Sequence, residues 1–453
     1  MRHFLTRYLV YPLYELASSR RILSKLAQLE ESQWWTPDQL VDWQEARLSQ
    51  LLHHAYATVP YYRRAFDAAG IRTGDLRNIS DLRHLPLLTK SIIQNQQREL
   101  VSDGVPLRQR ITNHTGGSTG TPMRFYQDQR QRDWGSASKL RFNRWAGWNF
   151  GKWTLRLWGH PQDLKAAQSA RGKLRSLALR EQTFDAFRFS LEDMADLVTT
   201  MRRTKPDLIV AYASMLSHFA TYLDNRKITD VPPPDGIITS TDMLLPHQRE
   251  TIERVLESTV FERYGCREVS VIAAECERHS GMHINTDRLI VEFTDENGQP
   301  VPPGQPGYVV ITDLFNYAMP FIRYNIEDVA VPAAERCSCG RGLPLIEELV
   351  GRYADILTTP RGEFVSASAL TTILSDIPGL RECQLVQKAT DWLQVNAACY
   401  PDYDESSETT FRDNLAAFFG PQMRITFHYV DQISRTTSGK KRFSVSEVEG
   451  TSL

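Results

Sequence analysis

Short β-rich runs alternate with helical segments from about residue 150 to residue 265, and this alternation constrains the fold more than any other feature. TLRLWG and DLIVAY are typical of buried strands, and SLEDMADLVTTMRR has a helical period with Ser190 as a candidate N-cap. VPPPDGIITSTDMLL leads into another strand, PHQRETIERVLES has proline in a helical first turn, and STVFERYG ends the series as a strand. The alternation predicts an α/β fold with parallel strand pairing.

The flanking segments have other patterns. Residues 37–110 are predicted to form helices joined by short loops, as in PDQLVDWQEARLSQLLHHAYATVP. Residues 288–331 place two strand-like runs around a Gly/Pro/Asn cluster, which predicts a hairpin within a mixed sheet or a small barrel. After Gly351 a small α+β unit is expected. The predicted fold is therefore α/β: a large N-terminal domain of mixed sheets flanked by helices, with a small barrel-like β part, and then a small C-terminal domain.

The expected domains are residues 1–350 and 351–453. Within the first, residues 1–110 are mostly helical, 111–290 form the α/β core and 288–350 are β-rich.

Composition excludes several classes of protein. With 41% hydrophobic and 24% charged residues, the 453-residue chain is an ordinary globular protein and is not mostly disordered. A net charge of -1 gives no overall electrostatic case for nucleic-acid binding. Six cysteines in so long a chain do not indicate a disulfide scaffold, so reduced thiols and a cytoplasmic location are expected. No apolar run reaches the roughly 18 residues of a membrane span, and no clear signal peptide is present.

The first 21 residues contain four arginines and one acid, a net charge of +3. Their apolar residues fall near helical spacing, although Pro12 should break or kink a helix there. These apolar residues are Phe4, Leu5, Tyr8, Leu9, Leu13 and Tyr14. The segment is either an arm packed on the body of the protein or a peripheral membrane contact, which its aromatic and arginine content favours.

Three stretches are candidates for nucleotide chemistry. NHTGGSTGTPMRFY (113–126) is glycine-rich and hydroxyl-rich but lacks the Gly-Lys of a Walker A loop. It is either a plain surface loop or a cradle in which backbone N–H groups bind phosphate. FERYGCREVS and MPFIRYNIEDVAV supply Tyr264 to stack on a base, Glu268 to bind a hard metal ion and Asp328 to bind ribose hydroxyls, although a core role for Tyr264 and a turn for Asp328 are alternatives. ISRTTSGKKRFSV places Lys440 in a tight basic turn.

In this order, the Gly/Ser/Thr loop, YGxxE, RYxxxD, GR and SGK resemble the adenylate-forming superfamily of acyl-CoA ligases, nonribosomal adenylation domains and luciferases. LVYPLYELASSRR, LLHHAYATVPYYRRAF, TGGSTGTP and RTTSGKKRF are most similar to its phenylacetate–CoA ligase branch, closest to the capsular polysaccharide (CapK-like) subgroup. The resemblance implies an ATP- and Mg²⁺-dependent ligase that makes an acyl-adenylate and transfers the acyl group to a thiol, such as CoA, or to an amine. It also implies a mobile C-terminal domain.

The resemblance assigns roles residue by residue. Glu268 would help hold Mg²⁺, Tyr264 with Gly265 would bind adenine, and Asp328 would bind ribose. Arg352 would approach the ribose and the hinge, and Lys440 would bridge the carboxylate and the α-phosphate. The phosphate loop is matched by Thr115, Gly116, Gly117, Ser118, Thr119, Gly120 and Thr121, and the adenine rim by Ser240, Thr241 and Asp242.

Three departures from the family pattern stand out. Thr121 replaces the loop lysine, Ala354 replaces the usual pivot acid of the hinge with Asp355 as a substitute, and YNIED keeps only Tyr324 and Asp328 of its signature. The enzyme alternative is a phenylacetate–CoA ligase. The alternative from another class is an inactive nucleotide-binding scaffold in polysaccharide assembly.

Two further groups of residues do not depend on ATP. Cys276 and His279 form C-x-x-H, and Cys337 and Cys339 form C-x-C, which could make a closed, structural Zn²⁺ site. His283 is a rival fourth ligand, and ordinary thiols and imidazoles are the alternative to a metal site. For the acyl group, the expected pocket residues, which could equally be core, are Trp158, His160, Tyr212 and Ser214.

Overall fold

The computed structural model describes residues 2–114, 123–158, 164, 167–185, 190–241, 244, 246–349, 357–361, 364–365, 377–433 and 444–448. The chain divides into two compact units. Unit 1 comprises Met1–His114, Met123–Gly151 and Phe261–Arg352, and unit 2 comprises Thr115–Pro122, Lys152–Val260 and Tyr353–Leu453. The division at Arg352 and Tyr353 lies close to the predicted domain boundary near residue 351, and the domain division itself stays a prediction.

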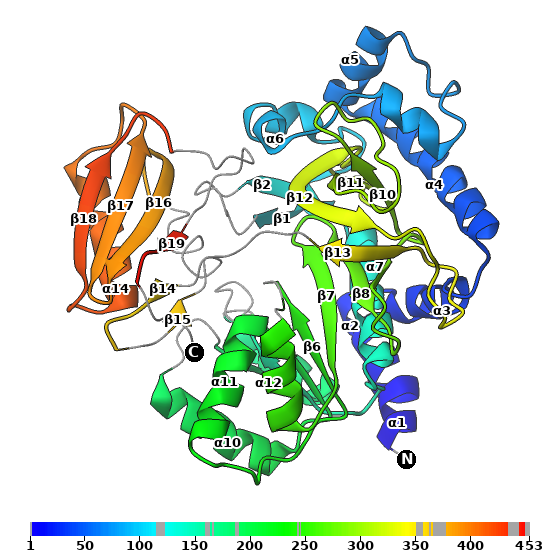
Figure 1. Cartoon of the computed structure of the whole chain (residues 1–453). Helices are drawn as coiled ribbons and strands as arrows, with labels where there is room; N and C mark the ends of the chain where they lie inside the picture. Colours follow the sequence, from blue (N-terminus) through cyan, green and yellow to red (C-terminus); the bar gives the residue numbers. More distant parts are fainter. Residues whose placement is uncertain are drawn as a thin grey trace. The chain divides into compact units, whose positions relative to one another are not determined.

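Unit 1 begins with helices (Figure 1). They are α1 (Arg2–Leu5), the π-helical η1 (Thr6–Val10), α2 (Tyr11–Ser18), α3 (Ile22–Ser32), α4 (Pro37–Thr58), α5 (Pro60–Ala69), η2 (Ile79–His84), α6 (Lys90–Asn95), η3 (Gln97–Leu100), η4 (Leu107–Gln109) and, after the first strands, α7 (Gln129–Trp145). The helical prediction for residues 37–110 is confirmed. Thr36 caps α4 with a capping box, and the helix ends before Pro60, which cannot continue it with an N–H donor.

The strands of unit 1 are mostly antiparallel. They are β1 (Ile111–His114), β2 (Arg124–Gln127), β7 (Val260–Cys266), β8 (Ser270–Glu275), β9 (Met282–Ile284), β10 (Leu289–Thr294), β11 (Gly307–Asp313), β12 (Tyr324–Pro332) and β13 (Leu345–Leu349). β1 pairs with β2, and the larger sheet has the order β10-β11-β12-β13-β9-β8-β7. The predicted hairpin is confirmed, since Leu289 on β10 pairs with Asp313 on β11. Among the described strands β10 has only β11 beside it. Of the two predicted alternatives, a mixed sheet or a small barrel, the structure therefore has the open sheet.

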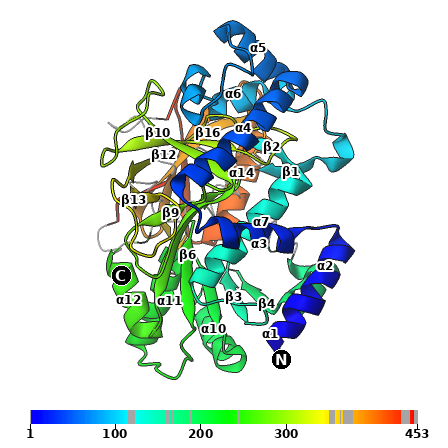
Figure 2. The same cartoon turned by 90° about the vertical axis from the view of Figure 1, so that its right-hand side faces the viewer.

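A buried ion pair joins α3, α7 and the β9–β10 turn. Arg141 on α7 binds Asp287, which also accepts a 2.6 Å hydrogen bond from Ser32 on α3. Arg141 donates to Asn285 as well, at 2.6 Å. Because buried charges are tolerated only when they are paired and hydrogen-bonded, this arrangement fixes α7 against the sheet. Figure 2 shows α3 and α7 side by side.

Unit 2 contains the predicted parallel strands. Its elements are β3 (Thr154–Leu157), α9 (Ala170–Leu179), β4 (Glu181–Phe184), α10 (Leu191–Thr204), β5 (Leu208–Ala211), α11 (Ala213–Asn225), β6 (Gly236–Ser240), α12 (Pro246–Leu256), β14 (Leu357–Thr358), β15 (Phe364–Val365), β16 (Leu380–Ala389), β17 (Trp392–Cys399), α14 (Glu405–Phe419), β18 (Arg424–Tyr429) and β19 (Ser444–Ser446). The strands run in the order β6-β5-β3-β4, and each of these pairs is parallel, as predicted. Ser190 caps α10 by accepting from the Asp193 backbone N–H, also as predicted.

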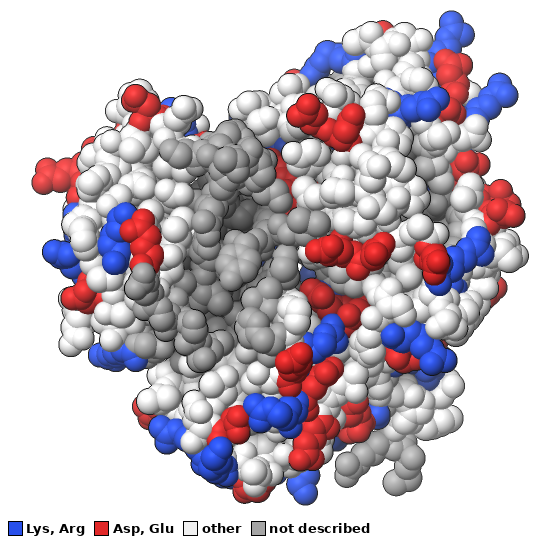
Figure 3. Space-filling view, in the orientation of Figure 1, with Lys and Arg blue, Asp and Glu red and all other residues white. Residues whose placement is uncertain are grey.

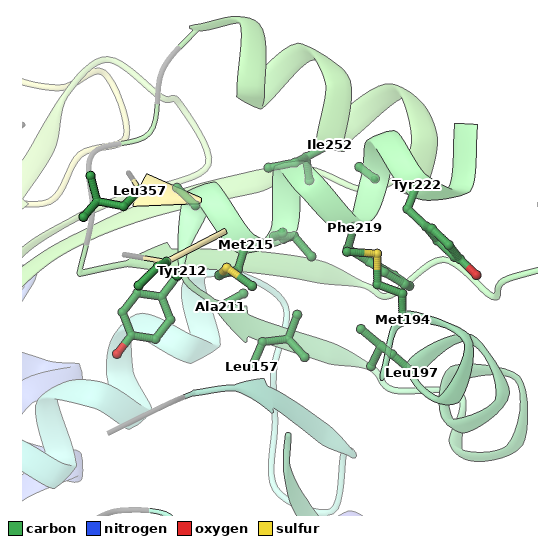
Figure 4. Close-up of a cluster of buried hydrophobic side chains, with 14 of the residues drawn as sticks. Leu157, Met194, Leu197, Ala211, Tyr212, Met215, Phe219, Tyr222, Ile252 and Leu357 are labelled. Atoms are coloured by element: carbon green, nitrogen blue, oxygen red, sulfur yellow. The ribbon is translucent and has the colours of Figure 1, made fainter. Parts of the chain in front are cut away.

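The core of unit 2 lies between the parallel strands and their helices. Leu157, Met194, Leu197, Phe219 and Ile252 are all buried in it (Figure 4). After the parallel strands, β14 pairs with β15, and a further sheet has the order β18-β17-β16-β19. Its core residues, such as Leu385, Leu393 and Phe411, belong to the same apolar cluster. The predicted α/β fold is thus confirmed.

Membrane spans and surface charge were both considered in the sequence, and the structure bears on each. No helix among them is long and apolar enough to cross a bilayer. Figure 3 shows acidic and basic side chains interspersed over the face that it presents, in keeping with the net charge of -1.

Candidate active site

Two tyrosine–carboxylate pairs connect β7 and the turn after it with β12. Tyr264 donates a hydrogen bond from its hydroxyl to Oδ2 of Asp328 at 2.8 Å. Tyr324 donates in the same way to Oε1 of Glu268 at 2.9 Å. All four side chains are buried. The structure therefore brings together the predicted adenine-binding, ribose-binding and metal-binding residues, and it adds Tyr324 as the group that orients Glu268.

The turn that carries Glu268 is held by donors from three elements. Its backbone carbonyl accepts from Gln127 of β2 at 3.1 Å and from Gln131 of α7 at 3.0 Å. The next carbonyl, of Val269, accepts from the buried Arg288. Arg288 also forms an ion pair with Asp313 at 2.9 Å, and burial raises the pKa of Asp313 although Arg288 lowers it. A turn fixed in this way presents the Glu268 carboxylate in one orientation.

Gly265 is required where β7 meets β8. The register shifts between Tyr264 and Gly265, which marks a bulge. A Cβ atom on Gly265 would lie 2.4 Å from the backbone oxygen of Ser270, closer than any side chain can approach. The close approach of β8 thus explains the glycine that follows the tyrosine in this motif.

The strands on both sides of residues 115–122 bind this same turn. Asn113 of β1 accepts a 3.3 Å hydrogen bond from Arg267, and Gln127 of β2 donates to the carbonyl of Arg267 at 3.2 Å. Asn113 and Gln127 also bind each other at 3.3 Å. The two strands that lead into and out of the glycine-rich segment are therefore anchored beside Glu268.

Cys266 on β7 is influenced by both carboxylates. Burial raises the pKa of Cys266 well above its ordinary value, and the charges of Glu268 and Asp328 raise it further. The side chain is consequently a thiol at neutral pH, and it is not activated as a nucleophile.

In unit 2, three candidate residues follow the carboxyl ends of adjacent parallel strands. Trp158 follows β3, Tyr212 follows β5, and Ser240 ends β6. The rings of Trp158 and Tyr212 lie 5.1 Å apart between their centroids. In Figure 4 the hydroxyl of Tyr212 points away from the apolar cluster. Ligands of open α/β sheets bind at this strand edge, so the position favours a pocket for these residues.

Thr241 continues from β6 in a strained conformation. Its φ is 87°, although it is a β-branched residue that disfavours positive φ. Strain of this kind is retained where the surrounding structure enforces it, often at functional sites. The exposed Thr241 side chain fits the predicted role at the adenine rim.

His218 is a further polar residue of this region that the sequence did not indicate. It lies on α11, one turn beyond Ser214, so both positions share one face of the helix. Burial lowers the pKa of His218 to about 4, which leaves the imidazole neutral at pH 7. In the sequence, only its position in the first turns after a predicted buried strand could have indicated His218 as a site residue.

The predicted metal-binding cysteines lie close together in unit 1. One ligand atom from each of four residues lies within 4.8 Å of the others. These residues are Cys276, His283, Cys337 and Cys339. The Sγ atoms of Cys276 and Cys337 are 3.7 Å apart, and Sγ of Cys339 is 3.3 Å from Nε2 of His283. The Nδ1 atom of His283 is bound to the carbonyl of Leu343 at 3.0 Å, which directs Nε2 toward the sulfur atoms.

His283 takes the fourth place instead of His279. Nδ1 of His279 binds Oε2 of Glu275 at 3.1 Å, and its ring packs against Phe261 at 4.8 Å. His279 has a positive φ of 50° and is not among the residues whose ligand atoms lie together. His283 lies on β9, beside β13, and so faces the loop that contains Cys337 and Cys339.

The remaining predictions fall elsewhere. Ser214 lies in the first turn of α11, and its side chain is not described. Several other predicted site residues lie outside the described residues: Thr115, Gly116, Gly117, Ser118, Thr119, Gly120, Thr121, His160, Asp242, Arg352 and Lys440. Their roles stay predictions.

Known proteins similar to this chain indicate its relatives. Residues 357–447 match the CapK C-terminal domain family. The chain is 28% identical over 338 residues to the phenylacetate–coenzyme A ligase of Escherichia coli K12, covering 71% of this chain and 72% of the relative. It is 20% identical to protein CapK of Staphylococcus aureus, covering 90% of each. The chain is a homologue of phenylacetate–coenzyme A ligases and CapK.

A solved structure of 2-hydroxyisobutyryl-CoA ligase, in complex with 2-HIB-AMP and CoA, has the same fold. The TM-score is 0.65 at 21% identity, and the match covers 92% of both chains. The chain therefore has the fold of this CoA ligase.

Proposed function

We propose that this homologue is an ATP-dependent, AMP-forming ligase that activates a carboxylic acid and transfers the acyl group to a thiol. The observation that carries the proposal is the double pairing of Tyr264 with Asp328 and of Tyr324 with Glu268. It holds two carboxylates beside the strands that flank a glycine-rich segment. The relatives that are phenylacetate–coenzyme A ligases support the same function.

The reaction has two steps. A carboxylate oxygen of the substrate attacks the α-phosphorus of ATP, and the bond to the β-phosphate oxygen breaks, so that acyl-AMP and pyrophosphate form. A thiolate then attacks the acyl carbon, and AMP leaves with the electron pair of the broken C–O bond. Catalysis in the first step needs neutralised phosphate charge and in-line geometry, and we assign Lys440 to bridge the acid and the α-phosphate.

A Mg²⁺ ion fits the chemistry of Glu268. Hard divalent cations bind carboxylate oxygens, and this carboxylate is oriented by Tyr324 and by the fixed turn beneath it. The bound ion would supply positive charge to the phosphates. The role of the protein is to hold that carboxylate in place. Asp328, oriented by Tyr264, accepts hydrogen bonds from the ribose hydroxyls.

CoA is the thiol that we propose, because the ligases similar to this chain are named for it. An amine on a sugar, amino acid or carrier is the alternative acceptor. The similarity to CapK favours a role in capsular or surface polysaccharide biosynthesis for whichever acyl product is formed.

A pyrophosphate-release assay over a panel of carboxylic acids, including phenylacetate and 2-hydroxyisobutyrate, tests the proposal. We expect turnover with at least one acid, loss of adenylation in Lys440→Ala, and wild-type turnover in the adjacent control Lys441→Ala. The mass of the product formed with CoA or with amines then identifies the acceptor. If no acid releases pyrophosphate and ATP does not bind, the inactive scaffold replaces the enzyme.

We also propose that the cluster of Cys276, His283, Cys337 and Cys339 holds a structural zinc ion. Tetrahedral ligands at about 2.3 Å for sulfur and 2.0 Å for nitrogen lie roughly 3.5 to 3.8 Å apart, close to the 3.7 and 3.3 Å separations between these ligand atoms. Zinc-bound histidines usually bind a second group through their other ring nitrogen, and Nδ1 of His283 makes such a hydrogen bond with the carbonyl of Leu343. Four protein ligands leave no open position, so the ion would serve the fold.

A further inference from the structure

The N-terminal helical segment, defined as residues Arg2–Ser18, is continuous through Pro12. The expected break is absent because α1, η1 and α2 follow one another without a gap, and the π-helical turn Thr6–Val10 precedes the proline. The wider turn accommodates a residue that lacks an N–H and crowds the preceding carbonyl. Figure 2 shows this segment near α3, with which α2 is in contact.

One face of the N-terminal helical segment packs on unit 1. Thr6 and Tyr11 are buried, and the ring of Tyr11 meets that of Phe150 edge to face at 4.8 Å. Nδ1 of His3 lies 3.1 Å from the carbonyl oxygen of Phe150, and the guanidinium of Arg7 lies over the same ring at 5.3 Å. The expectation of an arm packed on the body is therefore fulfilled on this side.

The opposite face of the segment is apolar and exposed. Its large side chains have exposed fractions between 46% and 81% and are Phe4, Leu5, Tyr8, Leu9, Leu13 and Leu16. From Phe4 to Ala17 the only other exposed residues are Pro12 and Ala17. No exposed charged residue therefore interrupts the face. The polarity is the reverse of that of an ordinary surface helix, which turns its apolar side to the protein.

Charged residues border this face. Arg7 is half-buried, with its guanidinium over the rings of Phe150 and Tyr8, and Arg20 and Arg21 follow the segment. Oε1 of Glu15, the one acid among the first 21 residues, accepts from the backbone N–H of Leu23 at 2.7 Å. Arg20 forms an ion pair with Asp133, whereas Arg21 is exposed. The first 21 residues have a net charge of +3 in a chain whose total is -1. An apolar face bordered by positive charge complements an anionic lipid surface.

We propose that this face docks on an anionic lipid bilayer, with its six large apolar side chains inserted at the interface. A second copy of this chain is the less favourable occupant, because pairing two such segments would bring together two regions that each have a net positive charge even after Arg20 is paired with Asp133. The inference is independent of the proposed function, since none of these residues belongs to the candidate active site.

Co-sedimentation of the full chain with vesicles tests the proposal. We expect the wild type to pellet with vesicles containing phosphatidylglycerol, and at least tenfold less with vesicles of phosphatidylcholine alone. The double variant Leu9→Glu/Leu13→Glu should lose at least tenfold of its binding to the anionic vesicles. Added salt at about 0.5 M should weaken wild-type binding, since it screens the arginines.

The matched control is Leu174→Glu/Leu177→Glu on α9, where both leucines are similarly exposed. It should bind as the wild type does, and both double variants should keep the wild-type melting temperature and pyrophosphate release, because the replaced side chains are at the surface. Wild type that stays in the supernatant with anionic vesicles overturns the proposal. So does a dimeric wild type without vesicle binding that becomes monomeric in Leu9→Glu/Leu13→Glu, which would make the face an interface between copies.

Discussion

The hydroxyl of Tyr264 is bound to Oδ2 of Asp328 at 2.8 Å, across 64 positions of sequence. The bond couples the aromatic residue to the carboxylate, because the Tyr264 side chain cannot change its χ1 rotamer without breaking the hydrogen bond. The assigned roles of the two residues, adenine stacking and ribose binding, therefore depend on each other.

Tyr264→Phe keeps the ring and removes this hydrogen bond. We expect the KM for ATP to rise roughly tenfold while kcat changes less, because a hydrogen bond to a charged group contributes about 1.5–3 kcal/mol and about 1.4 kcal/mol corresponds to a tenfold change. Steady-state pyrophosphate release at varied ATP measures it. Tyr308→Phe on β11 is the control, and an unchanged KM in Tyr264→Phe would contradict the coupling.

Tyr324→Phe releases Oε1 of Glu268 from its 2.9 Å hydrogen bond. The carboxylate would lose its fixed orientation, so we expect the Mg²⁺ concentration for half-maximal velocity to rise by about threefold to tenfold. Velocity should approach that of the wild type at saturating Mg²⁺, because the ligand itself remains. A lower maximal velocity with an unchanged Mg²⁺ requirement would instead indicate that Tyr324 acts on the reaction and not on the metal.

The fold was predictable where local patterns decide it. The helical period of α10, the N-cap Ser190 and the apolar runs of β3 and β5 each specify structure from a few neighbouring residues. The helix through Pro12 was not predictable in the same way, because only a π-helical turn makes room for the proline. Backbone adjustments of this kind leave no periodic signal in the sequence.

The candidate site was predictable in its residue types and not in its contacts. The order of the motifs indicated Tyr264, Glu268 and Asp328, but which tyrosine binds which carboxylate depends on how β7 and β12 are placed. For the cysteine cluster, local spacing favoured His279 over His283. The strand pairing of β9 with β13 decided for His283, and strand pairing is a non-local property.

His218 should make stability depend on pH. Burial lowers its pKa to about 4 in the folded chain, whereas an unfolded histidine has a pKa of about 6.5. Between these values the unfolded state binds the extra proton, so the contribution of His218 to stability is present above pH 6.5 and is lost as pH falls toward 4. We expect His218→Gln to flatten the slope by up to about 1.4 kcal/mol per pH unit in urea unfolding from pH 4.5 to 7. Parallel curves for both proteins would exclude this role.

Replacement of the zinc ligands gives the sharpest test of the metal proposal. Wild type should contain about one zinc per chain by elemental analysis. Cys337→Ser and His283→Gln should each lose most of it and melt at lower temperature, because an ion held by four residues from separate segments stabilises the folded state. Their thiols should also react faster with Ellman's reagent, since a bound zinc protects them.

His279→Gln is the matched control, because His279 has the same spacing from Cys276 but binds Glu275. We expect this variant to keep its zinc and its protected thiols, since Nδ1 of His279 is bound away from the sulfur atoms. Loss of zinc in His279→Gln with retention in His283→Gln would reverse the ligand assignment. A wild type purified without zinc that also fails to take it up from solution would refute the site, and Cys276, Cys337 and Cys339 would then be packed thiols beside Trp145 and Leu345.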